Sequence, residues 1–272
     1  MIIDSHFHSQ EMKRKGMPVG ALLEEAHSQG LAAAVDIATH IHDWGTRLKE
    51  LSKYPFVFFS LGLYPSVAEE QDLEKTLEAL ESLLLSETAI NPRLIAIGEI
   101  GLDFHWHYAT PELQTELLVQ QLELAQRFDL PVVIHNRNAD KVLAEILKQH
   151  GPARGGIMHC YSSGPEWIDM FLDQGMYISF AGNLTFKKNN SLREACALVP
   201  PDRLLLETDA PYLAPEPKRG KANHPGQVAF TYEVAAEIRT MSKPDLESQI
   251  AKNFRTLFPG AWADPRSPES PG

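Results

Sequence analysis

Two histidines near the start of the chain are placed so that they could hold a metal ion. His6 and His8 follow an apolar run and Asp4. In an extended strand, alternate side chains point to the same face, so the two imidazoles would project together. Imidazole nitrogens are common ligands of divalent transition metals. The same spacing is also typical of a solvated polar N-terminus, so the rest of the chain must decide between the two interpretations.

Four further residues with metal-binding side chains follow apolar runs later in the chain. Each comes at or just beyond the end of a predicted strand, the position at which barrel enzymes place their active sites. Taken singly, each has a structural explanation, such as a hydrogen-bonded rim histidine or a turn. Their common placement favours one site built from six residues. The candidate ligands are His6, His8, Glu99, His135, His159 and Asp209.

This set of side chains predicts a site for two divalent metal ions and hydrolytic chemistry. Two ions close together polarise a substrate oxygen and lower the pKa of a shared water. Glu99, central in strand order, should reach both ions, and Asp209 is also the candidate general base. Mixed imidazole and carboxylate sites accept Mg, Mn, Zn or Ni, so the metal stays open. We expect His6, His8 and Asp209 to share one ion, and His135 and His159 to share the other.

The elements that must position these side chains alternate between short apolar runs and longer amphipathic segments. The helix predicted over residues 72–85 is typical, with leucines recurring on one stripe. Eight strand-helix units predict a single (β/α)8 TIM barrel with its active site at the C-terminal strand ends; a doubly wound open sheet is the alternative. The predicted strands cover residues 2–4, 31–37, 56–61, 94–97, 131–134, 156–158, 176–179 and 204–206; the predicted helices cover 21–29, 43–52, 72–85, 111–128, 141–149, 165–173, 192–198, 228–239 and 243–257.

The composition is that of an ordinary globular protein. The chain has 272 residues, of which 43% are hydrophobic and 22% are charged, and this is enough for one core. The net charge of −11 argues against a protein that coats nucleic acid with a broad basic face. It does not exclude an enzyme that binds a few phosphates in one pocket.

The organisation of the chain predicts one domain and a tail. We expect a hydrolase barrel over residues 1–258 and a disordered segment, rich in Pro and Ser, over residues 259–272. No apolar run is long enough to span a membrane, and no secretory pattern opens the chain, so we expect a cytoplasmic protein. Cys160 and Cys196 form neither a disulfide framework nor a zinc spacing.

Several motifs together resemble those of the TatD-type metal-dependent deoxyribonucleases of the amidohydrolase superfamily. The similarity runs in order from Ile2 to Phe258. It implies a (β/α)8 barrel, divalent metal ions held by the same six ligands, and hydrolysis of phosphodiesters in DNA, often as a 3′-end exonuclease. The motifs are Asp4-Ser-His-Phe-His8, Gly98-Glu-Ile-Gly-Leu-Asp103, Pro131-Val-Val-Ile-His-Asn-Arg137, His159-Cys-Tyr-Ser162, Leu206-Glu-Thr-Asp-Ala-Pro211, Arg219-Gly-Lys-Ala-Asn223 and Asn253-Phe-Arg-Thr-Leu-Phe258.

Two positions depart from the pattern of this family. Tyr64 precedes Pro65 where the family commonly has His, and His224 stands where it commonly has Glu. Tyrosine donates a hydrogen bond but does not shuttle a proton at neutral pH as histidine does. Neither change touches a candidate metal ligand.

Basic and aromatic residues near the strand ends are candidates for substrate binding. Arg137 could bind a phosphate bidentately, or it could form a salt bridge. Arg219 and Lys221 lie in the loop after the eighth strand, which is either a phosphate-binding loop or a solvated one. Residues 104–108 are mostly aromatic and could stack on bases or pack on the barrel rim. The candidate substrate-binding residues are Arg137, Tyr64, Arg219 and Lys221.

We therefore predict a metal-dependent hydrolase that cleaves phosphodiester bonds at DNA or oligonucleotide ends as a 3′-5′ exonuclease. The alternative is an amidohydrolase-type enzyme acting on a small ester, lactone or phosphotriester. Enzymes of that kind often bridge their metals with a modified lysine, and residues 93–103 contain none. A non-catalytic barrel that binds a partner is a third possibility, although unused metal ligands are costly to keep together. Neither a membrane nor an obligate protein partner is expected.

Overall fold

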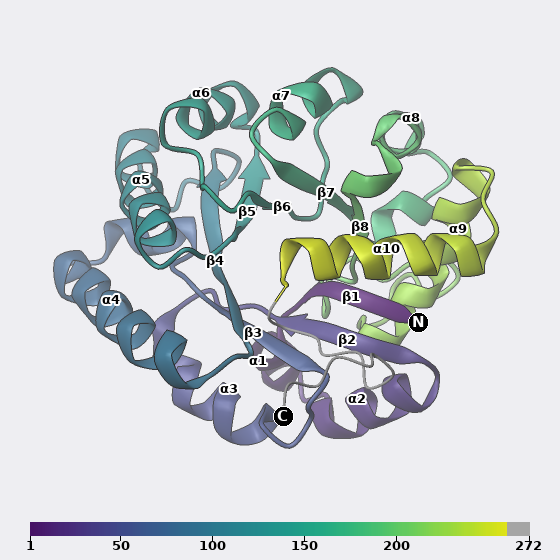
Figure 1. Ribbon diagram of the computed structural model, residues 1–272, viewed down its shortest axis with the longest axis horizontal. Coiled ribbons are helices and arrows are strands. Elements are labelled where there is room, and N and C mark those ends of the chain that lie inside the picture. Colours follow the sequence, from purple (N-terminus) through teal and green to yellow (C-terminus); the bar gives the residue numbers. More distant parts are fainter. Residues whose placement is uncertain (260–272) are drawn as a thin grey trace, which may run out of the picture.

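The strands of the computed structural model, which describes residues 1–259, form a single parallel sheet. The order of the eight strands is β1 to β8 in sequence, and helices surround them (Figure 1). This sequential order is that of a barrel and differs from that of a doubly wound sheet. The predicted TIM barrel is thus confirmed. The strands are β1 (Ile2–Phe7), β2 (Leu31–Asp36), β3 (Val57–Leu61), β4 (Leu94–Asp103), β5 (Val132–Arg137), β6 (Gly156–Met158), β7 (Met176–Phe180) and β8 (Leu204–Leu206).

Helices connect successive strands and cover the outside of the barrel (Figure 1). The α-helices are α1 (Ser9–Arg14), α2 (Val19–Ser28), α3 (Trp44–Leu51), α4 (Leu73–Ile90), α5 (Pro111–Arg127), α6 (Asp140–His150), α7 (Ile168–Leu172), α8 (Asn190–Leu198), α9 (Val228–Ile238) and α10 (Lys243–Leu257). The 3-10 helices are η1 (Ile41–Asp43), η2 (Pro65–Glu69), η3 (Pro165–Trp167), η4 (Gly182–Thr185), η5 (Pro201–Arg203) and η6 (Pro225–Gln227).

The barrel closes where the segment after β8 meets β1. A parallel bridge joins Phe7 to Ala210. The backbone N–H of Asp209 donates to the carbonyl of His6 at 2.9 Å, and that of His8 donates to the carbonyl of Ala210 at 2.8 Å. These bonds place Asp209 beside the two N-terminal histidines.

Three strands extend further toward the active-site end than the sequence predicted. The predicted ends at residues 4, 97 and 134 are wrong, because β1, β4 and β5 continue to Phe7, Asp103 and Arg137. The apolar pattern stops where side chains face the polar mouth of the barrel, but the backbones go on pairing. In β4 and β5, for example, Asp103 still pairs with Arg137. Glu99 therefore lies within a strand and not after one.

Three helical segments also differ from prediction, and the first is α4, which continues to Ile90, beyond the predicted end at residue 85. Helix α1 (Ser9–Arg14) was not predicted, and the helix predicted over residues 165–173 is η3 followed by α7. Six residues are too few to show a helical period, and Pro165 opens a separate 3-10 turn. Within residues 1–259 no helix combines the length and the apolar character that a bilayer crossing requires. Residues 260–272 of the predicted tail lie outside the described residues.

Close backbone contacts near Glu99 require glycine. A Cβ atom on Gly62 would lie 2.7 Å from the carbonyl carbon of Gly98. Gly101 has a φ of +144°, and a Cβ there would lie 2.0 Å from the carbonyl oxygen of His135. The glycines thus let β4 run close to its neighbours and carry Glu99 into the barrel mouth.

Candidate metal centre

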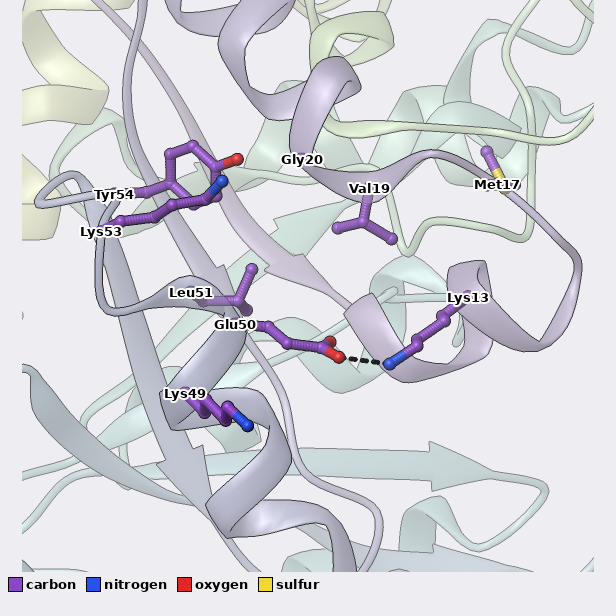
Figure 2. A pocket seen from close by; sticks show the side chains of 9 residues that line it. All are labelled: Lys13, Met17, Val19, Gly20, Lys49, Glu50, Leu51, Lys53 and Tyr54. Atoms are coloured by element: carbon purple, nitrogen blue, oxygen red, sulfur yellow. Dashed lines mark hydrogen bonds and ion pairs between the residues drawn. The ribbon is translucent and has the colours of Figure 1, made fainter.

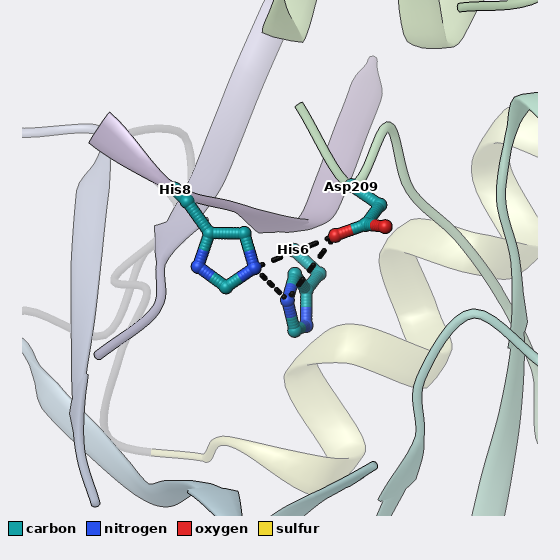
Figure 3. Close-up of side chains that lie close together, drawn as sticks. All are labelled: His6, His8 and Asp209. Carbon is teal, nitrogen blue, oxygen red and sulfur yellow. Dashed lines mark hydrogen bonds and ion pairs between the residues drawn. The ribbon is translucent and has the colours of Figure 1, made fainter. Parts of the chain in front are cut away.

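His6, His8 and Asp209 bring three possible ligand atoms together at the seam of the barrel (Figure 3). The Nε2 atoms of His6 and His8 are 3.0 Å apart. Asp209 Oδ1 lies 3.8 Å from His6 Nε2 and 3.4 Å from His8 Nε2. Ligands that bind one zinc ion tetrahedrally at about 2.1 Å are separated by about 3.4 Å. The spacing therefore fits one divalent cation.

Glu99, His135 and His159 form a second group of the same kind. Glu99 Oε1 lies 3.0 Å from His135 Nδ1 and 2.8 Å from His159 Nε2. The two histidine nitrogens are 3.2 Å apart. These distances again fit a single cation between three ligands.

Glu99 connects the two groups because its carboxylate oxygens face in different directions. While Oε1 faces His135 and His159, Oε2 lies 3.6 Å from His6 Nε2 and 3.5 Å from His8 Nε2. The side chain is almost fully buried, at 3% exposure. One carboxylate thus presents an oxygen to each group, which is the arrangement that a bridging ligand needs.

Three of the four imidazoles are oriented by a partner on the ring nitrogen that faces away from the ligand groups. His135 Nε2 is 3.1 Å from Asp103 Oδ2, and His159 Nδ1 is 3.3 Å from Glu207 Oε1. His8 Nδ1 is 3.2 Å from the carbonyl of Ile37. Such contacts fix the tautomer and the ring orientation of metal-binding histidines.

The charge balance of the site fits bound cations. Within residues 1–259, the ion pairs of Glu99 and Asp209 are with histidines and include no Lys or Arg. Buried carboxylates need a positive counter-charge, which protonated imidazoles or bound cations can supply. Divalent ions held by four imidazoles and two carboxylates would provide it.

The carboxylates and one imidazole of the site already have the protonation states that bind a cation, whereas burial is outweighed by nearby carboxylates that raise the pKa of His8, His135 and His159. Burial opposes ionisation of Glu99, but His159 and His135 keep the pKa of its carboxyl well below the usual range. For Asp209, burial is likewise outweighed by the hydrogen bond with His8, which lowers its pKa. Burial and the nearby His159 lower the pKa of His6. Both carboxylates are thus ionised and His6 is neutral, and a bound metal ion would displace any proton on the other three imidazoles.

Five of the six candidate ligands, all except His6, line a cavity of about 780 Å³ at the C-terminal ends of the strands. Tyr64 and Arg137, two of the predicted substrate-binding residues, line it. Arg219 and Lys221 are not among its lining residues. The Arg219 guanidinium pairs with Glu216 at 3.6 Å and lies over the ring of Phe186. The structure therefore brings together the six candidate ligands and two of the four substrate candidates.

Tyr64 contacts Asp103, the carboxylate that orients His135 in the second ligand group. Its hydroxyl donates to Asp103 Oδ2 at 3.0 Å and lies 3.2 Å from His135 Nε2. Burial raises the pKa of Tyr64, so the hydroxyl stays protonated. Burial opposes ionisation of Asp103, but His135 and the Trp106 N–H lower its pKa to about 2. Tyr64 therefore acts as a donor and helps to hold Asp103 against His135.

Sequence reasoning assigned no role to two buried carboxylates. Asp103 supports His135, and Asp4 accepts hydrogen bonds from the N–H and hydroxyl of Thr208 at 2.8 and 2.6 Å. Asp4 thereby holds the residue before Asp209. The sequence did contain a pattern that pointed to Asp4. It stands two residues before His6, so both side chains lie on one face of β1.

A second cavity, of about 480 Å³, lies among α1, α2 and α3, away from the ligand groups (Figure 2). None of the six candidate ligands lines it. Lys13 and Glu50 form an ion pair at its edge (Figure 2). Its lining residues are Lys13, Met17, Val19, Gly20, Lys49, Glu50, Leu51, Lys53 and Tyr54.

Comparisons with known proteins identify the family. The family model described as TatD related DNase matches residues 3–259. The chain is 32% identical to the uncharacterized metal-dependent hydrolase YabD of Bacillus subtilis, over 95% of this chain and 99% of that one. It is 31% identical to the uncharacterized metal-dependent hydrolase TatD of Mycobacterium tuberculosis, over 96% and 99%. The crystal structure of YjjV, a TatD homologue from Escherichia coli, is 31% identical and superposes with a TM-score of 0.86, over 95% and 98%. The chain therefore belongs to the TatD family of metal-dependent hydrolases.

Proposed function

We propose that this protein is a two-metal deoxyribonuclease that removes nucleotides from the 3′ ends of DNA. The observation that best supports this proposal is the position of Glu99, whose two carboxylate oxygens face different ligand groups. A carboxylate in this position supports a pair of ions and not one. The proposed ligands are His6, His8 and Asp209 for one ion, His135 and His159 for the other, and Glu99 for both. The metals are Mg, Mn, Zn or Ni.

Two divalent ions bound here would polarise the phosphodiester and make a water molecule acidic near neutral pH. Asp209 is the proposed general base. Its side chain is 14% exposed, whereas that of Glu99 is 3% exposed, so it is the more accessible of the two carboxylates. In the proposed reaction the water oxygen forms a bond to phosphorus as the bond from phosphorus to the 3′ oxygen breaks. Asp209 takes the water proton, and the departing 3′ oxygen takes a proton from solvent.

Basic and polar side chains in the cavity suit a phosphodiester substrate. Arg137 lines the cavity and presents a guanidinium that can bind a phosphate bidentately. Tyr64 lines it as a hydrogen-bond donor. Arg219 and Lys221 are proposed as contacts for a longer strand, outside the cavity. Residues 1–258 are proposed to act as one catalytic unit.

Metal ions in such a site would also activate water for attack on a small ester, lactone or phosphotriester, so the substrate must be measured. We propose incubating the protein with single-stranded DNA labelled at its 5′ end, in Mg²⁺ or Mn²⁺, and in parallel with lactones and a paraoxon-like phosphotriester. The expected result is stepwise shortening from the 3′ end with release of 5′-mononucleotides, abolished by a chelator. Turnover of a lactone or phosphotriester without DNA cleavage would overturn the proposal.

A pair of variants tests the role of Asp209 in the same assay. Asp209→Asn should lower kcat/KM on DNA by at least about 100-fold, since it removes the proposed base and weakens a ligand. Asp202→Asn is the matched control, because the Asp202 carboxylate is 67% exposed and lies in η5, outside the cavity. A similar loss in both variants would contradict the assignment.

A further inference from the structure

One wall of the cavity carries exposed aromatic rings from the loop between β4 and α5. Trp106 and Tyr108 both line the cavity. Trp106 is 49% exposed and Tyr108 is 40% exposed, with ring centroids 6.4 Å apart. Neighbouring exposed aromatic rings at the edge of a pocket are typical of ligand-binding sites. Both rings therefore keep much of their surface open where they border the cavity that holds the ligand groups.

Arg137 adds a positive charge to the same wall. It ends β5, two residues after His135, and its Cζ lies 5.5 Å from the centroid of the Trp106 ring. Within residues 1–259, the carboxylates around the site pair with histidines and none of them pairs with Arg137; they are Glu99, Asp103, Glu207 and Asp209. Its guanidinium is therefore packed on an indole and still able to bind a phosphate.

The topology places this wall across the barrel from the proposed base. In an eight-stranded barrel in sequential order, β4 and β5 lie opposite β8 and β1. Asp209 follows β8, so the water it activates approaches phosphorus from that side. The leaving oxygen departs in line, on the opposite side, toward Trp106 and Arg137. In removal of a 3′-terminal nucleotide, that oxygen belongs to the penultimate nucleotide.

We propose that Trp106, Tyr108 and Arg137 form a subsite for the penultimate nucleotide of a single strand. The unpaired base stacks on the Trp106 and Tyr108 rings, and Arg137 binds the phosphate on its 5′ side. This inference rests on the proposed DNase activity and adds a binding position to it. Stacking on a protein aromatic ring is sequence-tolerant, so the subsite selects an unpaired base of any identity.

The test compares two single-stranded substrates, one normal and one with an abasic site at the penultimate position. The quantity measured is the ratio of kcat/KM for the normal strand to that for the abasic strand. Because it is taken within one variant, this ratio does not depend on how much of the preparation is folded. We expect a ratio of about 5 to 150 for the metal-loaded wild-type enzyme and a ratio near 1 for Trp106→Ala. Trp106→Phe should give an intermediate ratio.

His107→Ala is the matched control. His107 is exposed in the same loop and does not line the cavity, so this variant should keep the wild-type ratio. Arg137 is tested by a strand with an uncharged methylphosphonate on the 5′ side of the penultimate nucleotide. This change should reduce cleavage by the wild type and have little further effect on Arg137→Ala.

The outcomes separate the subsite from the activity on which it rests. DNA cleavage by the wild type with a ratio near 1, or a wild-type ratio kept by Trp106→Ala, would overturn the subsite and leave the proposed function intact. A penalty confined to an abasic site at the terminal position would also overturn it. Failure of the wild type to cleave any strand would overturn the proposed function and the subsite together.

Discussion

Replacing Glu207 by Gln should weaken the binding of one metal ion and leave the other unaffected. Glu207 is fully buried, at 0% exposure. Its Oε1 accepts the backbone N–H of Cys160 at 2.9 Å and lies 3.3 Å from His159 Nδ1. Gln keeps the size of the side chain and one carbonyl oxygen but removes the negative charge. The substitution thus probes the charge that orients His159.

The size of the effect follows from these contacts. A hydrogen bond to a charged group contributes about 1.5–3 kcal/mol, and a neutral one about 0.5–1.5 kcal/mol. Losing the charge therefore costs about 1–2 kcal/mol, or roughly a 5- to 30-fold weaker Kd at about 1.4 kcal/mol per tenfold. This overlaps the about 10- to 100-fold losses usual when the partner of a metal-binding histidine is removed.

The assay is calorimetric titration of Zn²⁺ or Mn²⁺ into protein stripped of metal. We expect Glu207→Gln to bind two ions, one with wild-type affinity and one more weakly. Glu145→Gln on α6 is the control, because Glu145 is exposed and lies outside the cavity. Wild-type affinity at both sites would refute a positioning role for Glu207. Loss of one ion from the stoichiometry would refute it too, since Glu207 would then be a ligand.

Three further predictions concern stability. Metal removal by EDTA should lower the Tm in scanning fluorimetry by about 5–10 °C, since a site filled at 100 times its Kd contributes about 2.7 kcal/mol; an unchanged Tm would argue against tight metal binding. Arg47→Met should lower the free energy of unfolding, measured in urea, by about 3–5 kcal/mol. The buried Asp36 carboxylate would lose its cationic partner, since it lies 2.7 Å from the Arg47 guanidinium. The control is Lys75→Met, because Lys75 forms an exposed ion pair with Asp72; it should change the free energy of unfolding by no more than about 0.5 kcal/mol. Equal changes in the two variants would be evidence against a stabilising role for the buried pair. Gly101→Ala should cost more than about 1 kcal/mol and reduce metal content, since its Cβ would lie 2.0 Å from the His135 carbonyl oxygen.

The barrel was predictable because its strands are buried on both faces and therefore appear as short apolar runs. Strands β6 and β8 have the predicted bounds of residues 156–158 and 204–206. The six candidate ligands could be found for the same reason, since a polar residue stands out where such a run ends. The ends of β1, β4 and β5 were not predictable from that pattern. Their last residues still pair as strands, although some of them, such as His6, Glu99 and His135, are polar and belong to the ligand groups.

The carboxylates that orient the metal-binding histidines could not be predicted from the sequence, because they contact residues far away in the chain. Asp103 and His135 are 32 positions apart, and Glu207 and His159 are 48 apart. Their pairing depends on strand register and on the path of β4, which no local pattern encodes. Glu207 stands two residues before Asp209, a position that by itself does not distinguish orienting a ligand from filling the barrel. Its contact with His159 supports the orienting role.

The central claim is that six side chains hold two ions with Glu99 between them, and anomalous diffraction tests it most directly. Crystals grown with Mn²⁺ or Zn²⁺ should show two anomalous peaks. One is expected among His6, His8 and Asp209, the other between His135 and His159, with a Glu99 oxygen facing each. The second peak should be lost or weakened in Glu99→Ala. A single peak in the wild type, or peaks outside these two groups, would contradict the account.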